Sequence, residues 1–419
     1  MEILLRQARI IDPSSSFHQQ QADIFIQDGI IKKIGTLSKS GADLKEIHGV
    51  HVSPGWVDLF AQFGDPGYEY RETLATGSEA AASGGYTDVL ILPNTAPVLH
   101  NKSGIEYIVQ RSRGLPVSIH PIGAITKNAE GKELAEMYDM HQSGAAAFSD
   151  GIQTIQSAGL LLKALQYLKA IAKTVIQLPN DRSVNPSGLM HEGVVSTRLG
   201  LPGMPAIAED LMIVRDLELV KYTGSKLHLT GISTAGAVAL IRLAKAEGVA
   251  VSCSVTPYHL WFTDEDLKAY DTNLKLTPPV RTEKDRAALR AAVLDGTIDC
   301  IATHHMPLDT DHKVVEFEYA LPGMTGLETS YGIVRTCMPE LSEERLAALF
   351  STAARNLFDL QAVTIQEGQP ASLTLFDPQA TWKVPAGRSR SRNTPFTGIE
   401  LKGKPIGIIN KDKLFLNEL

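Results

Sequence analysis

Eight short apolar segments, separated by amphipathic helical stretches, constrain the fold of this chain more than any other feature. They lie between about Val52 and Leu357 and read GWVDLFAQF, YTDVLILPN, VSIHPIGAIT, GAAAFSD, TVIQLPN, KLHLTGIST, VAVSCSV and DCIAT. Short runs that alternate with helices are typical of parallel β-strands joined by helical crossovers. Eight of them favour an α/β fold, a TIM-like (β/α)8 barrel, over an open sheet.

Both ends of the chain differ from this middle part and are rich in β-branched residues and turns. EILLRQARII and ADIFIQDGIIKKIG stand near the start, and ASLTLFDPQATWKV and GIELKGKPIGIINKDKLF near the end. We expect residues 1–52 and 358–419 to form one composite β-sandwich domain beside a barrel of residues 53–357. The basic stretch PAGRSRSRN, Pro385–Asn393, carries no aromatic residue and is expected to be a solvated surface loop.

The overall composition excludes several functional classes. The net charge is −7, so no basic excess points to nucleic acid or to an anionic membrane surface. The chain has no apolar run of membrane-spanning length, and its first residues lack the plan of a signal peptide, so we expect a cytoplasmic protein. Cys253, Cys300 and Cys337 are odd in number and far apart, which argues against a disulfide framework and favours buried free thiols.

Chemistry in a barrel of this type is placed where the strands end, at their C-terminal tips. The residues that the pattern places at these tips are Phe60, Gln62, Asn94, Asp150, Gln177, Gly231, Ser254 and His304. Neighbours on a strand point to opposite faces, so of His304 and His305 one is expected to line the mouth and the other to pack outward. His228 and His259 are expected to make structural hydrogen bonds.

The segments around these tips resemble the dihydroorotase family of the amidohydrolase superfamily over nearly the whole chain. PGWVDLFAQFGDPG is similar to that family's Pro-Gly-x-x-Asp-x-His-x-His-x-Arg-Asp-Pro-Gly, and AAAFSDG, LHLTGISTAGAV, DGTIDCIATHHMPLDTDHK and NTPFTG follow in the family's order. The resemblance implies an amidohydrolase-type barrel with a small β-domain from both termini. It also implies descent from a zinc hydrolase that interconverts dihydroorotate and N-carbamoyl-aspartate in pyrimidine biosynthesis.

Departures from the family pattern fall on its metal site. Four positions that bear histidine ligands in the family carry other residues here: Phe60, Gln62, Gln177 and Gly231. Asp150 keeps its identity, and His304 stands where the family has its catalytic aspartate. A catalytic zinc needs about three good lone-pair donors, which a phenyl ring, a glycine and neutral amides do not supply. We therefore expect no bound metal, no cofactor and no catalytic residue, with Asp150 a vestigial ligand and His304 a degenerate catalytic position.

Substrate recognition is altered as well. Gly64 stands at the family's carboxylate-binding arginine, and Leu308 at a histidine that contacts the same carboxylate. Without this arginine the chain loses a side chain that binds both oxygens of a carboxylate, and no neighbouring side chain in the sequence evidently replaces it. Asn94 and Asn273 match other substrate contacts, although both stand in turns, where asparagine is favoured for backbone reasons.

Three hypotheses remain open. The first is an inactive pseudo-dihydroorotase that acts as a non-catalytic partner or scaffold of aspartate transcarbamoylase, as such members of the family do, in a homodimer or hetero-oligomer. The second is an active dihydroorotase, or another cyclic-amide hydrolase, with a site rebuilt from Asp150, His304 and further side chains. The third is a small-ligand sensor that uses the vacated pocket, which Asn94 and Asn273 alone support.

Overall fold

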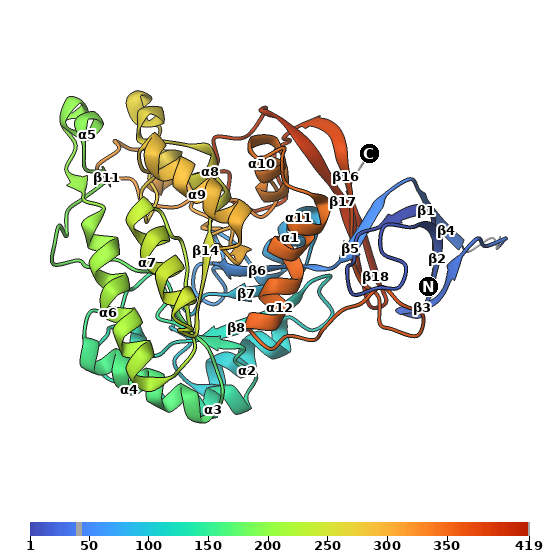
Figure 1. The fold of residues 1–419 in the computed structure, drawn as a ribbon, viewed down its shortest axis with the longest axis horizontal. Coiled ribbons are helices and arrows are strands. Elements are labelled where there is room, and N and C mark those ends of the chain that lie inside the picture. The colour runs from blue at the N-terminus through green and yellow to red at the C-terminus, as the bar shows by residue number, and fades with distance from the viewer. Residues whose placement is uncertain (39–43, 418–419) are drawn as a thin grey trace.

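Eight strands from the middle of the chain form a nearly closed parallel barrel in the computed structural model, which describes residues 1–38 and 44–417 (Figure 1). In spatial order these strands are β15 (Cys300–Ile301), β14 (Val251–Val255), β13 (Leu227–Leu229), β10 (Val175–Gln177), β9 (Ala147–Phe148), β8 (Ser118–Gly123), β7 (Tyr86–Ile91) and β6 (Trp56–Ala61). The predicted α/β barrel is therefore confirmed. The strands are short, and β9 and β15 consist of only two residues each.

The barrel closes between its first strand and the segment after its last. Buried Asp58 of β6 accepts hydrogen bonds from the backbone N–H of Thr303 at 2.7 Å and from the Thr303 hydroxyl at 2.9 Å. Ala61 then pairs with His305, whose carbonyl accepts from the N–H of Gln62 at 2.8 Å. A buried carboxylate needs such donors to offset its lost hydration. Asp58 therefore fixes the register at which the eighth segment meets the first strand.

Amphipathic helices surround the barrel, as their sequence periodicity predicts. α4 shows the cause: its cap Ser157 accepts from the Leu160 N–H, and its apolar face, formed by Leu161, Ala164, Leu165 and Leu168, is buried in the core. The longer helices are α1 (Leu74–Ser83), α2 (Lys102–Arg111), α4 (Ala158–Ala170), α6 (Ile207–Thr223), α7 (Ala235–Ala246), α9 (Glu283–Asp295) and α10 (Ser330–Cys337). The shorter elements are α3 (Met137–Gln142), β11 (Met190–His191), α5 (Val194–Leu199), β12 (Gly203–Met204), α8 (Pro257–Trp261), α11 (Glu343–Ala347) and α12 (Ala353–Leu357). Among the described residues, no helix is both long and apolar enough to pass through a membrane.

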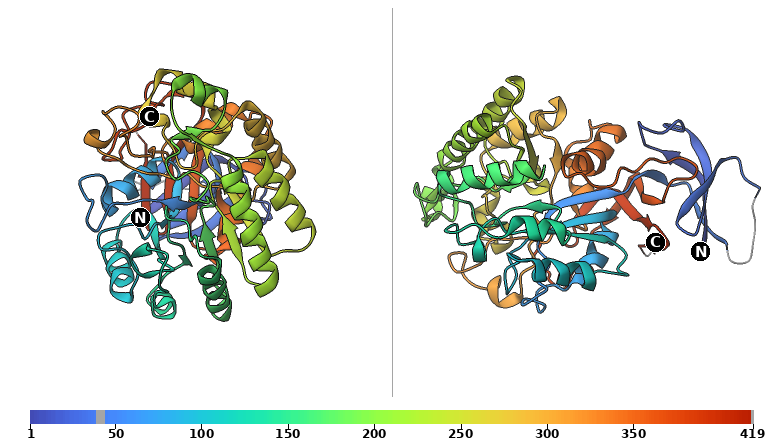
Figure 2. Two further views of the ribbon diagram at one scale, coloured as in Figure 1. Left: turned by 90° about the vertical axis from the view of Figure 1, so that its left-hand side faces the viewer. Right: turned by 90° about the horizontal axis from the view of Figure 1, so that it is seen from below.

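A second sheet combines strands from both ends of the chain and lies beside the barrel (Figures 1 and 2). Its order is β18 (Lys413–Leu416), β17 (Glu400–Asn410), β16 (Ser372–Lys383), β5 (His51–Pro54), β1 (Glu2–Ile10), β2 (Gln21–Gln27) and β3 (Ile30–Gly35), with β4 (Leu44–His48) also paired to β1. The predicted limits of this domain, residues 1–52 and 358–419, stay a prediction. They include residues 39–43 and 418–419, which lie outside the described residues.

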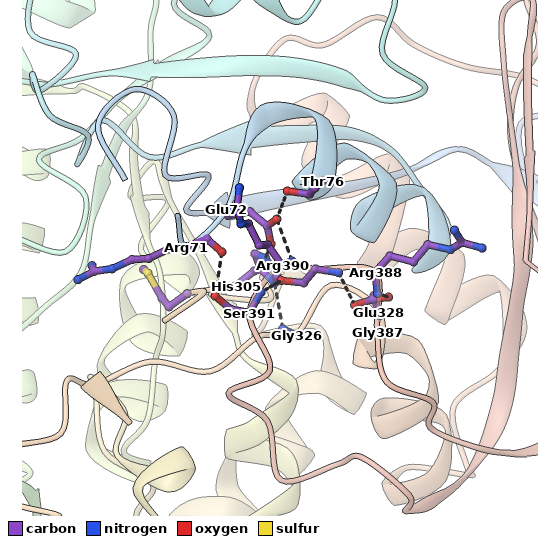
Figure 3. Close-up of polar contacts among 12 residues, drawn as sticks. Arg71, Glu72, Thr76, His305, Gly326, Glu328, Gly387, Arg388, Arg390 and Ser391 are labelled. Atoms are coloured by element: carbon purple, nitrogen blue, oxygen red, sulfur yellow. Dashed lines mark hydrogen bonds and ion pairs between the residues drawn. The ribbon is translucent and has the colours of Figure 1, made fainter. Parts of the chain in front are cut away.

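The basic segment Pro385–Asn393, here called the strap, is not the solvated loop that its composition predicts (Figure 3). Ser389 is 0% exposed and its hydroxyl donates to Glu72, while Glu328 accepts two strap N–H groups at 2.6 and 3.3 Å. The Asn393 amide N–H group donates at 2.9 and 3.2 Å to carbonyl groups beside the barrel mouth. Two carboxylates of the barrel therefore hold the strap, because each needs donors in its buried position.

Candidate functional site at the barrel mouth

A pocket of about 810 Å³ opens at the C-terminal ends of the barrel strands. Three of the predicted site residues line it: Gln62, Asn94 and His304. The other predicted site residues are outside its lining: Phe60, Asp150, Gln177, Gly231 and Asn273. Asn273 lies in a single turn, where its backbone N–H donates to Asp271 at 2.9 Å. An amidohydrolase-type barrel performs its chemistry in this pocket. The side chains at the base of the pocket therefore decide which reaction or ligand the site can support.

An aromatic pair stands at the barrel mouth, and of its two rings only that of His304 lines the pocket. The rings of Phe60 and His304 lie 4.4 Å apart between centroids at an interplanar angle of 31°, and both side chains are buried. His304 has a φ of 46°, a left-handed backbone conformation that is uncommon for residues other than glycine. A β-carbon on Gly231 would lie 2.7 Å from Cε1 of this imidazole. The His304 ring therefore occupies the space into which a side chain at position 231 would project.

A chain of buried hydrogen bonds holds this imidazole from below. Nε2 of His304 is 2.8 Å from the Thr230 hydroxyl, which is 2.9 Å from the Ser254 hydroxyl. Ser254 is in turn 3.0 Å from Nε2 of His228, whose Nδ1 lies 2.9 Å from the Ser252 hydroxyl. Burial, together with the neighbouring His259 and His228, lowers the pKa of His304 to about 3. At neutral pH His304 is therefore a neutral, positioned ring and a weak acceptor of protons.

Asp150 is held inside the barrel wall by Thr126. Its two oxygens accept from the Thr126 N–H at 2.9 Å and from the Thr126 hydroxyl at 2.5 Å. Burial raises the Asp150 pKa to about 6, against the opposing effect of these hydrogen bonds. Asn94 donates to the Asp150 carbonyl at 3.0 Å and accepts from the Ile152 N–H at 3.1 Å, and Gln62 donates to the Asn94 carbonyl at 2.9 Å. These polar side chains therefore brace the loops of the mouth against one another.

Gln177 is likewise engaged by its own neighbours. Its amide oxygen accepts from the Ile155 N–H, and its amide nitrogen donates to Asp216, both at 3.4 Å. Burial raises the Asp216 pKa to about 6, although the adjacent Arg215 opposes this shift. The amide that replaces a histidine of the family pattern therefore links the fifth strand to α6 and does not project into the pocket.

Gly64 and Leu308, which stand at the family's contacts to the substrate carboxylate, do not provide such a contact here. A β-carbon on Gly64 would lie 2.4 Å from the Tyr68 carbonyl oxygen, and Leu308 lines the pocket with an apolar side chain. Arg71, which sequence reasoning missed, does line the pocket, but its guanidinium is 3.1 Å from Asp309 and stacks over the Tyr68 ring. Its place seven residues after the substituted arginine position gave no signal in the sequence.

Other partners in the site were also missed by sequence reasoning. Thr230 directly follows β13 and Thr126 comes three residues after β8, so a search for hydroxyls just beyond the strand ends would have found both. His305 points away from the mouth: its Nδ1 accepts from the Gly326 N–H at 3.1 Å and its Nε2 lies 3.5 Å from Glu72 (Figure 3). Burial alone would raise the Glu72 pKa, but hydrogen bonds and the nearby imidazole keep this pKa below its usual value.

Known structures define the class to which this fold and site belong. The L-hydantoinase (dihydropyrimidinase) from Arthrobacter aurescens superimposes with a TM-score of 0.85 at 25% sequence identity, over 98% of this chain and 95% of its own. A D-hydantoinase (dihydropyrimidinase) from Thermus sp. superimposes with a TM-score of 0.82 at 21% identity, over 99% of this chain and 95% of its own. The chain is thus a barrel of the amidohydrolase type, with the small sheet domain that accompanies it.

Sequence relatives narrow this class to one family. The family model described as "Dihydro-orotase-like" matches residues 49–237. A dihydroorotase from Pelotomaculum thermopropionicum is 41% identical over 411 residues, which cover 97% of this chain and 96% of the relative. A dihydroorotase from Syntrophus aciditrophicus is 38% identical and matches both chains over their full length. The chain belongs to the dihydroorotase family, whose members act in pyrimidine biosynthesis.

Family membership bears on the predicted absence of a cofactor, and it raises the question whether the side chains present fit a zinc ion. The prediction that no cofactor applies is wrong, because the related dihydroorotases and hydantoinases are zinc-dependent and the family implies zinc here too. The described side chains nevertheless do not fit zinc at the barrel mouth. Among residues 1–38 and 44–417, no group of three or more His, Cys, Asp or Glu residues is arranged to hold a metal. Asp150, the one retained ligand type, already accepts two hydrogen bonds from Thr126.

Proposed function

We propose that this member of the dihydroorotase family does not open or close the dihydropyrimidine ring, and that it serves pyrimidine biosynthesis as a partner of aspartate transcarbamoylase. The observation that carries the proposal is the buried pair of Phe60 and His304, of which the His304 ring lines the pocket. This imidazole fills the volume beside Gly231, and its partner Phe60 stands where the family has a histidine ligand.

The chemistry of His304 supports this proposal. Hydrolysis needs a base at the eighth strand that accepts a proton from water near neutral pH. With a pKa of about 3 and Nε2 within hydrogen-bond distance of Thr230, His304 is a poor base at that pH. The substrate carboxylate would also lack its cation, since Gly64 has no room for a side chain and Arg71 is paired with Asp309.

The outer surface of α6 supports a role as a partner protein. Its outward line over the first two turns consists of Ile207, Leu211 and Val214, which are 50%, 47% and 45% exposed. The solvent face of a barrel helix is ordinarily polar, and contiguous exposed apolar side chains mark interaction surfaces. We assign this face to aspartate transcarbamoylase, the enzyme with which inactive members of the family associate.

An active dihydroorotase is the second candidate function. It is favoured by the 41% identity to a dihydroorotase over 97% of this chain, which far exceeds what fold alone requires. The mouth also retains an open volume of about 810 Å³ with polar walls. This candidate requires a metal cage and a base built from residues other than those at the family positions.

Two measurements on one purified sample distinguish the candidates. Turnover of dihydroorotate is assayed with zinc added, and the chain is mixed with aspartate transcarbamoylase from the same organism and followed by sedimentation velocity. The proposal expects no turnover and a faster-sedimenting complex. Leu211→Glu is expected to weaken the complex, whereas Leu294→Glu, on α9 and 48% exposed, serves as a matched control that leaves it intact. Turnover without a complex would establish the second candidate instead.

A further inference from the structure

A second pocket, of about 600 Å³, lies between the barrel and the terminal sheet domain and shares no lining residue with the mouth. Its walls come from the strap, from the end of β16, from the middle of β17, and from the segment Thr325–Thr329 that precedes α10. Nothing in the chemistry of the family site uses this space. Its size is within the range of about 300–1,000 Å³ that is usual for small-molecule sites.

The strap presents its cations outward through an alternating pattern. Ser389 and Ser391 are buried, whereas Arg388, Arg390 and Arg392 are exposed. The serine hydroxyls bond inward to the barrel, which holds the strap with its arginines on the exposed side, where the Arg392 guanidinium also donates to the carbonyl groups of Gly387 and Ser389. Figure 3 shows Arg388 extending away from the barrel contacts at Glu72. The position of these positive charges is therefore set by the fold.

The charges that line the pocket are strongly unbalanced. Four cationic side chains line it, Lys383 from β16, Lys404 from β17, and Arg388 and Arg392 from the strap. Glu328 is the one carboxylate among the lining residues, and it is already engaged by two backbone N–H groups of the strap. In a protein with a net charge of −7, such convergence of cations in a concave site is a local feature and not a general property of the surface.

We propose that this pocket binds a phosphorylated small molecule. Phosphate oxygens are bound by converging guanidinium and ammonium groups, and arginine can bind two of them at once. Hydroxyl groups of Thr329 and Thr394 and the indole of Trp382 also line the space and provide neutral donors and an apolar wall for the rest of the ligand. An acidic protein segment carries the same charge, but a pocket of about 600 Å³ suits a compact ligand better than an extended chain.

Isothermal titration calorimetry of the full chain with inorganic pyrophosphate tests this site. The double substitution Lys383→Gln with Lys404→Gln removes two lining charges and is expected to weaken binding about tenfold or more, which is ~1.4 kcal/mol. The matched control, Lys163→Gln with Lys284→Gln, removes two exposed lysines on α4 and α9 and is expected to leave the affinity within about twofold. Thermal unfolding of each variant verifies that it is folded.

Saturable binding at one site per chain, lost in the pocket variant and kept in the control, would support the proposal. Equal weakening in both variants would indicate general attraction of anions and overturn it, as would the absence of saturable binding. A poly-glutamate peptide is titrated in parallel as the alternative ligand. Tighter binding of this peptide than of pyrophosphate would assign the pocket to an acidic protein segment and likewise overturn the proposal.

Discussion

Replacing Gly231 by alanine should destabilise the chain because the His304 ring occupies the space of the new methyl group. At Gly231 φ is +68°, and a β-carbon there would lie 2.7 Å from the imidazole and 3.0 Å from the Leu178 side chain. A left-handed residue with a β-carbon costs about 1–2 kcal/mol, and overpacking of a core adds about 1–3 kcal/mol. We therefore expect the free energy of unfolding to fall by about 2–5 kcal/mol.

Urea denaturation measures this loss, and two further variants separate its causes. Gly200 has a φ of +70° with no atom within 4 Å of its β-carbon position, so Gly200→Ala should cost only the backbone part, about 1–2 kcal/mol. Adding His304→Ala to Gly231→Ala should recover an interaction energy of about 1–3 kcal/mol. If Gly231→Ala costs no more than Gly200→Ala, the imidazole does not fill the mouth as described.

Three further predictions concern the buried polar groups. The His228 pKa is lowered to about 3 mainly by burial, so an unfolded chain binds one more proton there between pH 6.5 and 3, and stability falls as the pH drops through that range. In urea titrations at pH 7 and pH 5, His228→Gln should reduce the loss of stability between these two values by about 2 kcal/mol, and an unchanged loss would contradict the assignment. Thr126→Val should cost about 1–3 kcal/mol of unfolding free energy, because Asp150 loses a buried donor, and a neutral result in the same titration would count against that bond. Glu72→Gln should loosen the strap at Ser389 and speed limited trypsin digestion within it, whereas digestion at the wild-type rate would show that the strap is held otherwise.

The repeat of apolar runs and helices is local, which is why the barrel could be predicted from the sequence. Each run ends in a turn, and the helices carry apolar faces such as that of α4, so the alternation identifies the fold without any long-range information. The composite sheet was visible for the same reason, through β-branched runs at both ends. The same strand pattern placed Gln62, Asn94 and His304 at the barrel mouth, where the structure has them.

Contacts between distant parts of the chain could not be predicted in this way. Ser389 of the strap bonds to Glu72, which is 317 residues away, and no local pattern in an arginine-rich segment reveals a buried carboxylate beneath it. The φ of 46° at His304 is set by the closure of the barrel, and it is this conformation that turns the ring onto Phe60. Whether the space beside Gly231 stays open or is filled depends on such three-dimensional packing.

The most direct test of the account is the rate at which this chain converts dihydroorotate to N-carbamoyl-aspartate, measured with zinc added and beside the dihydroorotase of Pelotomaculum thermopropionicum under the same conditions. Because a neutral His304, packed on Phe60, lines the mouth in place of a base, we expect product formation no faster than in buffer alone. Zinc-dependent turnover at a rate comparable to that of the relative would contradict it.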